Sequence, residues 1–167
     1  MAQRATQSVM VAATPSRVYS VVVDFGRYRE WVADLKEIDV VERDADGRAL
    51  EVAFRAAAFG RSTRYTLRYD YSRAPELLSW HQTRGDVAES LNGSYRFDPV
   101  PAGAPESTGA PESTGAPEST GDPATTVTYD LEVTLAVPVP QFIQGRAAGR
   151  IQRHALSELK RRVERLP

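Results

Sequence analysis

The chain has 167 residues, of which 21 are lysine or arginine and 22 are aspartate or glutamate, so its net charge at pH 7 is −1. A length of this order predicts one domain, residues 1–167, with a continuous core. The near-neutral balance creates no field that would attract nucleic acid or an anionic membrane surface. We therefore expect no nucleic-acid partner.

The absence of cysteine excludes disulfides, thiolate nucleophiles and sulfur-bound zinc. With only two histidines in the chain, we expect no metal site. No apolar run is long enough to span a bilayer, and the N-terminal residues lack the apolar segment of a signal peptide. The sequence thus predicts a cytoplasmic protein without an integral membrane segment.

Two short helices are predicted near the N-terminus, after a strand at about residues 7–12. Thr14 can cap the first helix with Pro15 at its first position, and Gly26 can end it. We expect Asp24 to cap the second, tight helical turn. Aromatic residues recur there at every third position and lie on one side, where they either border a cavity or attach the helices to a sheet: Phe25, Tyr28 and Trp31.

Beyond Leu35 the apolar period changes to two, which is typical of strands. A hairpin turns at Asp46-Gly47, and Gly93 marks either a bulge or a close approach of another chain segment. A helical pattern then runs from about 141 to 165. The six strands predicted between the short helices and this last helix cover residues 38–40, 50–56, 65–71, 77–83, 87–98 and 127–135.

The predicted fold is therefore α+β, an antiparallel sheet whose apolar face turns toward a single long helix. The hexapeptide APESTG, written three times over 104–121, falls between two of these strands. Its composition cannot bury enough apolar surface to offset the entropy of ordering the chain. We therefore expect a disordered inserted loop at 102–123 and look for the function elsewhere.

Four segments of the chain resemble a known family: TPSRVY at 14–19, VDFGRYREW at 23–31, GSYRF at 93–97 and TVTYDL at 126–131. They are similar to the START-related SRPBCC superfamily, in its branch of polyketide cyclases/dehydrases and coenzyme-Q-binding-like proteins. The resemblance implies a helix-grip fold, in which a curved antiparallel sheet of about seven strands wraps a long C-terminal helix. It also implies a cavity that binds lipids, quinones or polyketides, where some members catalyse cyclisation or dehydration.

The strand alternation selects an inward face with several aromatic rings, which suits a pocket for an apolar ligand. A packed core without a pocket is the alternative, because any such sheet must bury one face. On the last helix, the small residues at 145–149 either let the helix approach the sheet or leave room for a ligand. The candidate cavity-lining residues are Val52, Phe54, Tyr65, Leu67, Tyr69, Trp80, Tyr95, Phe97, Tyr129, Leu131, Phe142 and Gly149.

Catalytic groups are not evident in the sequence. His81 follows the inward Trp80 and should lie on the opposite face, and His154 lies among arginines, so both are expected to be exposed. Acidic residues in the strands alternate outward, so no carboxylate pair is predicted. Without a cofactor motif, no cofactor is expected, and binding of an apolar small molecule is the leading hypothesis. The alternative is a polyketide cyclase, aromatase or dehydratase, and whether there is turnover stays open.

Overall fold

The structure is a computed structural model that describes residues 2–58, 61–100, 123–136 and 147–165. The copies of the APESTG repeat and Phe142 lie outside the described residues. Three helical segments are described: α1 (Pro15–Val22), the 3-10 helix η1 (Phe25–Glu30) and α3 (Ala147–Arg165). The strands are β1 (Ala2–Val11), β2 (Leu35–Arg43), β3 (Ala49–Ala58), β4 (Arg61–Asp70), β5 (Leu77–Gly85), β6 (Ala88–Val100) and β7 (Ala124–Leu135).

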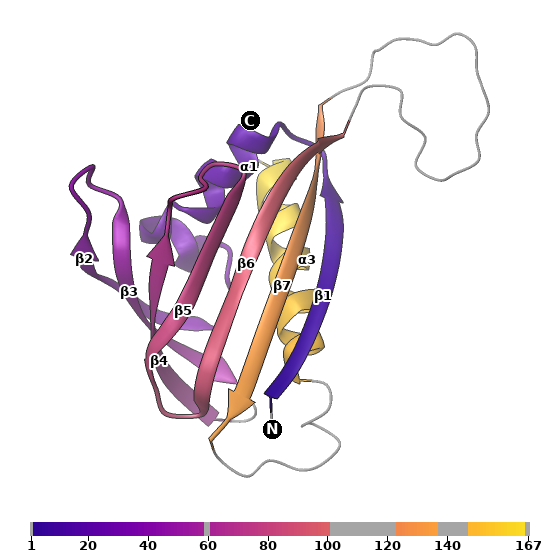
Figure 1. The fold of residues 1–167 in the computed structure, drawn as a ribbon. Helices are drawn as coiled ribbons and strands as arrows, with labels where there is room; N and C mark the ends of the chain where they lie inside the picture. The colour runs from indigo at the N-terminus through magenta and orange to yellow at the C-terminus, as the bar shows by residue number, and fades with distance from the viewer. Residues whose placement is uncertain (1, 59–60, 101–122, 137–146, 166–167) are drawn as a thin grey trace, which may run out of the picture.

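The strands form one sheet in the order β1-β7-β6-β5-β4-β3-β2, and every neighbouring pair is antiparallel. The sheet is curved, and the long helix α3 lies along its concave side (Figure 1). This arrangement confirms the α+β helix-grip prediction. Strand β1 begins at Ala2, earlier than predicted, because it pairs with β7 along its whole length.

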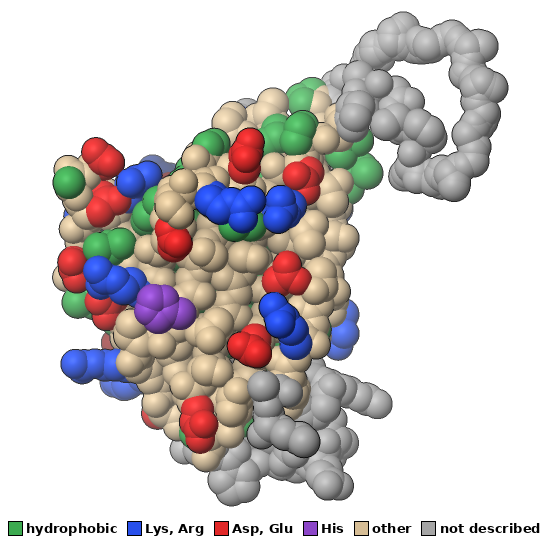
Figure 2. All heavy atoms as spheres, viewed as in Figure 1, with side chains coloured by type: hydrophobic (Ala, Val, Ile, Leu, Met, Phe, Trp, Pro, Cys, Tyr) green, Lys and Arg blue, Asp and Glu red, His purple; other side chains and the backbone are tan. Residues whose placement is uncertain are grey.

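The outer face of the sheet carries acidic and basic side chains that are interspersed (Figure 2). Several of them form cross-strand ion pairs, such as Arg68 with Glu42 and Glu51 at 3.3 and 3.1 Å. Such mixing of charges leaves no large patch of one sign on the face in view. This pattern agrees with the net charge of −1.

Helix α1 starts as its sequence predicts. The Thr14 hydroxyl accepts a hydrogen bond from the Arg17 backbone N–H at 3.2 Å, and Pro15 occupies the first turn. The prediction for Asp24 was wrong, because its carboxylate makes no capping bond to η1. The carboxylate instead pairs with Arg27 at 3.5 Å, and only the Asp24 carbonyl accepts the Arg27 backbone N–H.

Helix α3 is attached to one end of the sheet, where it packs on β1 and β7. The fully buried Gln152 donates from its Nε2 to the carbonyls of Ala5 in β1 and Tyr129 in β7, both at 2.7 Å. One turn earlier, Gln7 of β1 donates to the Gly149 carbonyl at 3.1 Å. The helix is therefore held against β1 and β7 by polar contacts as well as by its apolar face.

Gly93 in β6 is a point of close approach between three strands. It pairs with Trp80 of β5 and Leu131 of β7 without a shift of register, so it marks no bulge. A Cβ placed there would lie 2.5 Å from the Asp130 carbonyl oxygen and 2.8 Å from Cζ2 of Trp80. The absence of a side chain lets the Trp80 indole approach the backbone of β6.

Gly93→Ala should therefore destabilise the fold by about 1 to 3 kcal/mol, since the neighbouring backbone and indole must move. Urea unfolding would measure the change. Gly26→Ala is the matched control, because a Cβ at Gly26 would meet nothing within 4 Å. Equal effects of the two substitutions would contradict the steric explanation.

Candidate functional site

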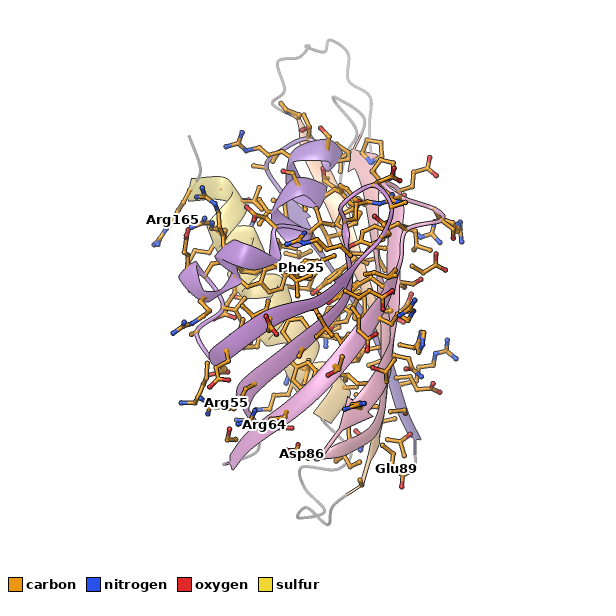
Figure 3. The ribbon with its side chains drawn as sticks, turned by 90° about the vertical axis from the view of Figure 1, so that its left-hand side faces the viewer. Phe25, Arg55, Arg64, Asp86, Glu89 and Arg165 are labelled. Atoms are coloured by element: carbon orange, nitrogen blue, oxygen red, sulfur yellow. The ribbon has the colours of Figure 1, made fainter. Side chains whose placement is uncertain are left out.

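A cavity of about 1460 Å³ lies between the concave face of the sheet and α3. Its wall is made by side chains of β3 to β7 on the sheet, by η1 and the segment after it, and by one face of α3. The cavity exists because α3 packs at the β1–β7 end, while the sheet continues to curve through β6, β5, β4 and β3. In Figure 3, Phe25 of η1 lies between the short helices and the sheet.

The structure brings most of the predicted lining residues together around this cavity. They come from five strands, β3 to β7, and along each strand they alternate with outward neighbours, as a period of two requires. The predicted residues that line the cavity are Phe54, Tyr65, Leu67, Tyr69, Trp80, Tyr95 and Tyr129. These residues, six of them aromatic, form much of the sheet wall, and their contact with a ligand stays a prediction.

Three predicted residues belong to the packed core instead. Val52, Phe97 and Leu131 point to the inner face but are buried among other side chains and do not line the cavity. Phe97, for example, meets the ring of Tyr19 in α1 edge-on, with centroids 5.8 Å apart. Helix α1 packs on β6 and β7, and α3 packs on β7, so these helices fill part of the inner face.

Gly149 was also placed wrongly as a lining residue. It does not border the cavity but faces β1, where a Cβ would lie 3.2 Å from Nε2 of Gln7. The small residues of this helix could either let it approach the sheet or leave room for a ligand. Gly149 lets α3 approach the sheet closely. Phe142 lies outside the described residues.

The aromatic residues Phe25, Tyr28 and Trp31 divide between the two roles that the sequence allowed, bordering the cavity and attaching the short helices to the sheet. Tyr28 and Trp31 line the cavity, and their rings are in contact with each other at 5.0 Å. Phe25 is buried, at 2% exposure, and attaches η1 to the sheet through Tyr69, with centroids 4.9 Å apart. The sequence could not divide these roles, because all three side chains share one side of the turn.

The tyrosine hydroxyls in the cavity are held in the neutral form. Burial raises the pKa of Tyr65 to about 12, and burial also raises the pKa of Tyr95 and Tyr129. Tyr95 and Tyr129 share a hydrogen bond, and Tyr28 donates its hydroxyl to the Val22 carbonyl. Near neutral pH these groups can exchange hydrogen bonds with a ligand, but they cannot act as phenolate bases.

An ionisable cluster on the α3 side of the cavity was not predicted. Nε2 of His154 lies 3.2 Å from Oδ2 of Asp34 and 3.6 Å from Oε2 of Glu158, and all three residues line the cavity. His154 is exposed, as expected, but it borders the cavity mouth. Glu158 is 7% exposed and accepts the Ala33 backbone N–H at 3.0 Å.

Strand alternation does not apply to Glu158, because this residue lies on helix α3. The spacing of His154 and Glu158, four residues apart beside the apolar stripe of α3, was the signal that could have revealed them. Within the described part of the chain, no group of three or more His, Asp or Glu side chains is arranged to hold a metal ion. An imidazole beside two carboxylates is suited to hydrogen bonding and proton transfer.

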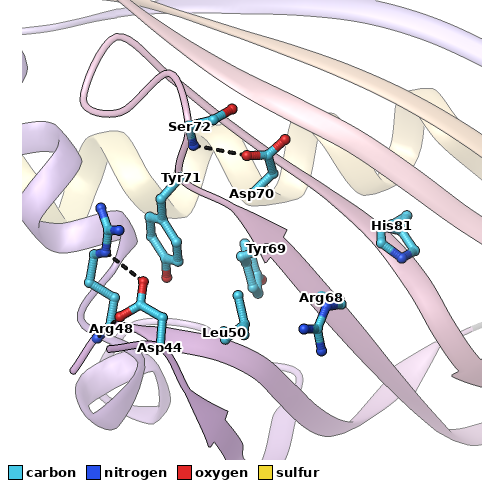
Figure 4. A pocket seen from close by; sticks show the side chains of 9 residues that line it. All are labelled: Asp44, Arg48, Leu50, Arg68, Tyr69, Asp70, Tyr71, Ser72 and His81. Carbon is cyan, nitrogen blue, oxygen red and sulfur yellow. Dashed lines mark hydrogen bonds and ion pairs between the residues drawn. The ribbon is translucent and has the colours of Figure 1, made fainter. Parts of the chain in front are cut away.

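A second, smaller pocket of about 380 Å³ is lined by residues of β3, β4 and β5 and of the segments after β2 and β4 (Figure 4). Arg48 pairs there with Asp44 at 2.8 Å and lies over the ring of Tyr71, and the Asp70 carboxylate accepts the Ser72 backbone N–H. His81 borders this pocket and is exposed, opposite the buried Trp80, as predicted. Because Arg48, Asp44 and Asp70 already have partners here, this pocket is the weaker candidate for a ligand site.

Solved structures with the same fold cover nearly the whole chain. A START superfamily protein from Mycobacterium smegmatis superposes with a TM-score of 0.80 at 23% identity, covering 98% of this chain and 99% of that one. The Zhui aromatase/cyclase from Streptomyces sp. R1128 has a TM-score of 0.72 at 13% identity, with 99% and 95% covered. The di-domain aromatase/cyclase BexL matches over 46% of its length, with 97% of this chain covered, a TM-score of 0.67 and 18% identity.

The protein thus has the helix-grip fold of these structures. The family model described as polyketide cyclase/dehydrase and lipid transport matches residues 2–164. The chain belongs to this family, which confirms the resemblance found in the sequence. No curated protein sequence matches this chain. None of the helices described is long and apolar enough to cross a membrane.

The raised tyrosine pKa values predict how stability depends on pH. Burial raises the pKa of Tyr65 and Tyr71 to about 12 in the folded protein, whereas unfolded tyrosines ionise near pH 10. Above about pH 10 the unfolded state loses protons that the folded state keeps, so the free energy of unfolding should fall as pH rises. Below about pH 10 this contribution is fully present.

Phenolate absorbance of the folded protein, compared with that in denaturant, would test this prediction. All seven tyrosines have a raised pKa, so at about pH 10 the folded protein should show much less phenolate than the unfolded one. Coincident titration curves for the two states would show that the tyrosines are accessible to water.

Proposed function

We propose that this protein binds an apolar small molecule, such as a lipid, quinone or polyketide, in the cavity between the sheet and α3, for transport or sequestration. The observation that carries the proposal is the cavity itself, whose 1460 Å³ exceeds the range of about 300 to 1,000 Å³ typical of ligand pockets. Residues 1–167 would act as one domain. A cytoplasmic location and the lack of a nucleic-acid partner stay predictions.

The chemistry of the wall supports an apolar ligand. Rings from β3, β4, β5, β6 and β7 face those of Tyr28 and Trp31, so a flat or flexible apolar molecule would be enclosed on two sides. Each methylene group removed from water contributes about 0.8 kcal/mol to binding. The neutral tyrosine hydroxyls can bind carbonyl or quinone oxygens at little cost. Binding in this form needs no cofactor.

A second candidate is catalysis in the same cavity, as a polyketide cyclase, aromatase or dehydratase. It is supported by the cluster of His154, Asp34 and Glu158, because ring closure and loss of water both require proton transfer. The aromatase/cyclase names of two similar structures agree with this candidate. Incubation with a linear β-polyketone would distinguish the two functions. A cyclised isomer, or a product lighter by one water, formed faster than without protein indicates turnover, whereas compound recovered unchanged from its complex with the protein indicates binding alone.

Native mass spectrometry of freshly purified protein tests the leading proposal directly. A bound mass that organic extraction releases as a lipid, quinone or polyketide is the expected result. The neutral fluorescent probe N-phenyl-1-naphthylamine provides a second test, because its emission rises in an apolar cavity. A protein that carries no compound and leaves this probe dark would contradict the proposal.

Filling the cavity should abolish binding. Ala155 of α3 lines the cavity, so the indole of Ala155→Trp would occupy the space of a ligand. We expect at least a tenfold loss of N-phenyl-1-naphthylamine affinity, while the far-ultraviolet circular dichroism spectrum stays unchanged. Arg161→Trp places the same side chain on the exposed face of the same helix and is the control. If both variants keep full affinity, the probe binds elsewhere.

A further inference from the structure

Glu158 has a carboxylate oxygen that no group in the described part of the chain satisfies. Its Oε2 accepts the Ala33 backbone N–H and faces His154, whereas its Oε1 is buried without a hydrogen-bond partner. The residue lines the cavity and is only 7% exposed. Because buried polar atoms are normally paired, a lone carboxylate oxygen at a cavity wall points to a donor that comes from a ligand.

The sheet wall of the same cavity holds a hydrogen-bond donor that likewise has no partner among the described residues. Nε1 of Trp80 is buried without a partner, and the residue is 7% exposed. Its indole is held by the close approach of Gly93 and by the rings of Tyr69, Tyr95 and Tyr129, so the N–H cannot turn to another acceptor. An N–H in this position is complementary to a carbonyl or ether oxygen.

The charges around Glu158 limit the kind of donor. Asp34 and Glu158 are the acidic side chains that line the cavity, and the basic ones are Lys36, Arg150 and Arg153, with His154 between them. The basic groups outnumber the acidic ones, so an ammonium ion would meet repulsion on entry. A neutral hydroxyl can donate to a carboxylate without that cost and forms a strong, charge-assisted hydrogen bond.

We propose that the cavity is specific for an aromatic or polycyclic ligand with two polar ends: a hydroxyl that donates to Oε1 of Glu158, and an oxygen that accepts from Nε1 of Trp80. This inference rests on the proposed binding function and adds the polar groups that the ligand carries. Glu158 and Trp80 are then the residues that determine specificity, and the tyrosine and apolar side chains supply the surface between them.

Two probes that differ only at the hydroxyl test the role of Glu158: 6-acetyl-2-naphthol and its methyl ether. The wild-type protein should bind the naphthol at least about tenfold more tightly, since a hydrogen bond to a charged group is lost in the ether. Affinities are measured by displacement of N-phenyl-1-naphthylamine and by calorimetry. Glu158→Gln should weaken the naphthol at least about fivefold and change the ether less than about twofold.

Matched variants separate this role from a structural one. Glu158→Met removes both oxygens at similar volume and should abolish the preference for the naphthol. Glu76→Gln changes an exposed carboxylate outside the cavity and should leave both affinities unchanged. For Trp80, Trp80→Phe should weaken 6-acetyl-2-naphthol but not 6-ethyl-2-naphthol, which has no carbonyl.

The outcomes distinguish this inference from the function on which it rests. Equal affinities for the naphthol and the ether, or an equal loss of both in Glu158→Gln, would overturn the specificity while leaving the cavity as a binding site. If neither compound displaces the fluorescent probe, the inference is overturned as well. A protein that binds neither the fluorescent probe nor either naphthalene would overturn the proposed function itself.

Discussion

The cavity depends on where α3 is fastened to the sheet. Gln152 donates from one nitrogen to carbonyls of two adjacent strands, β1 and β7, at 2.7 Å each, and it is fully buried. A buried amide with two such bonds holds the helix at one end of the sheet, because a shift would leave several polar groups unpaired. The sheet then curves away from the helix through β6 to β3, and the space between them cannot be closed by α3 alone.

The side chains around this space fall into two chemical groups. The sheet and η1 supply rings whose hydroxyls stay protonated because burial raises their pKa, so this wall is apolar with neutral hydrogen-bonding points. Helix α3 supplies His154 and the buried Glu158 beside Asp34. A ligand that satisfies both walls is therefore apolar along most of its length and polar at defined positions. The same ionisable cluster keeps catalysis open as a second function.

Much of the architecture could be predicted because it depends on local pattern. The change from a helical period to a period of two located the strands, and Thr14 with Pro15 located the start of α1. Most of the proposed sheet wall followed from alternation alone. Alternation cannot separate Tyr95, at the cavity, from Phe97, under α1, since both point to the same face. That difference depends on which helix covers which part of the sheet.

By itself, the sequence determined the elements, their order and the inward face of each strand. These properties follow from side-chain period and turn residues, which are local. The family followed from the resemblance of four sequence segments to its members. Only the tertiary structure decided that Gly149 faces β1 instead of the cavity and that Glu158 meets Asp34 and His154 at its wall. These contacts join residues far apart in the chain, and their geometry arises from the curvature of the sheet and the position of α3.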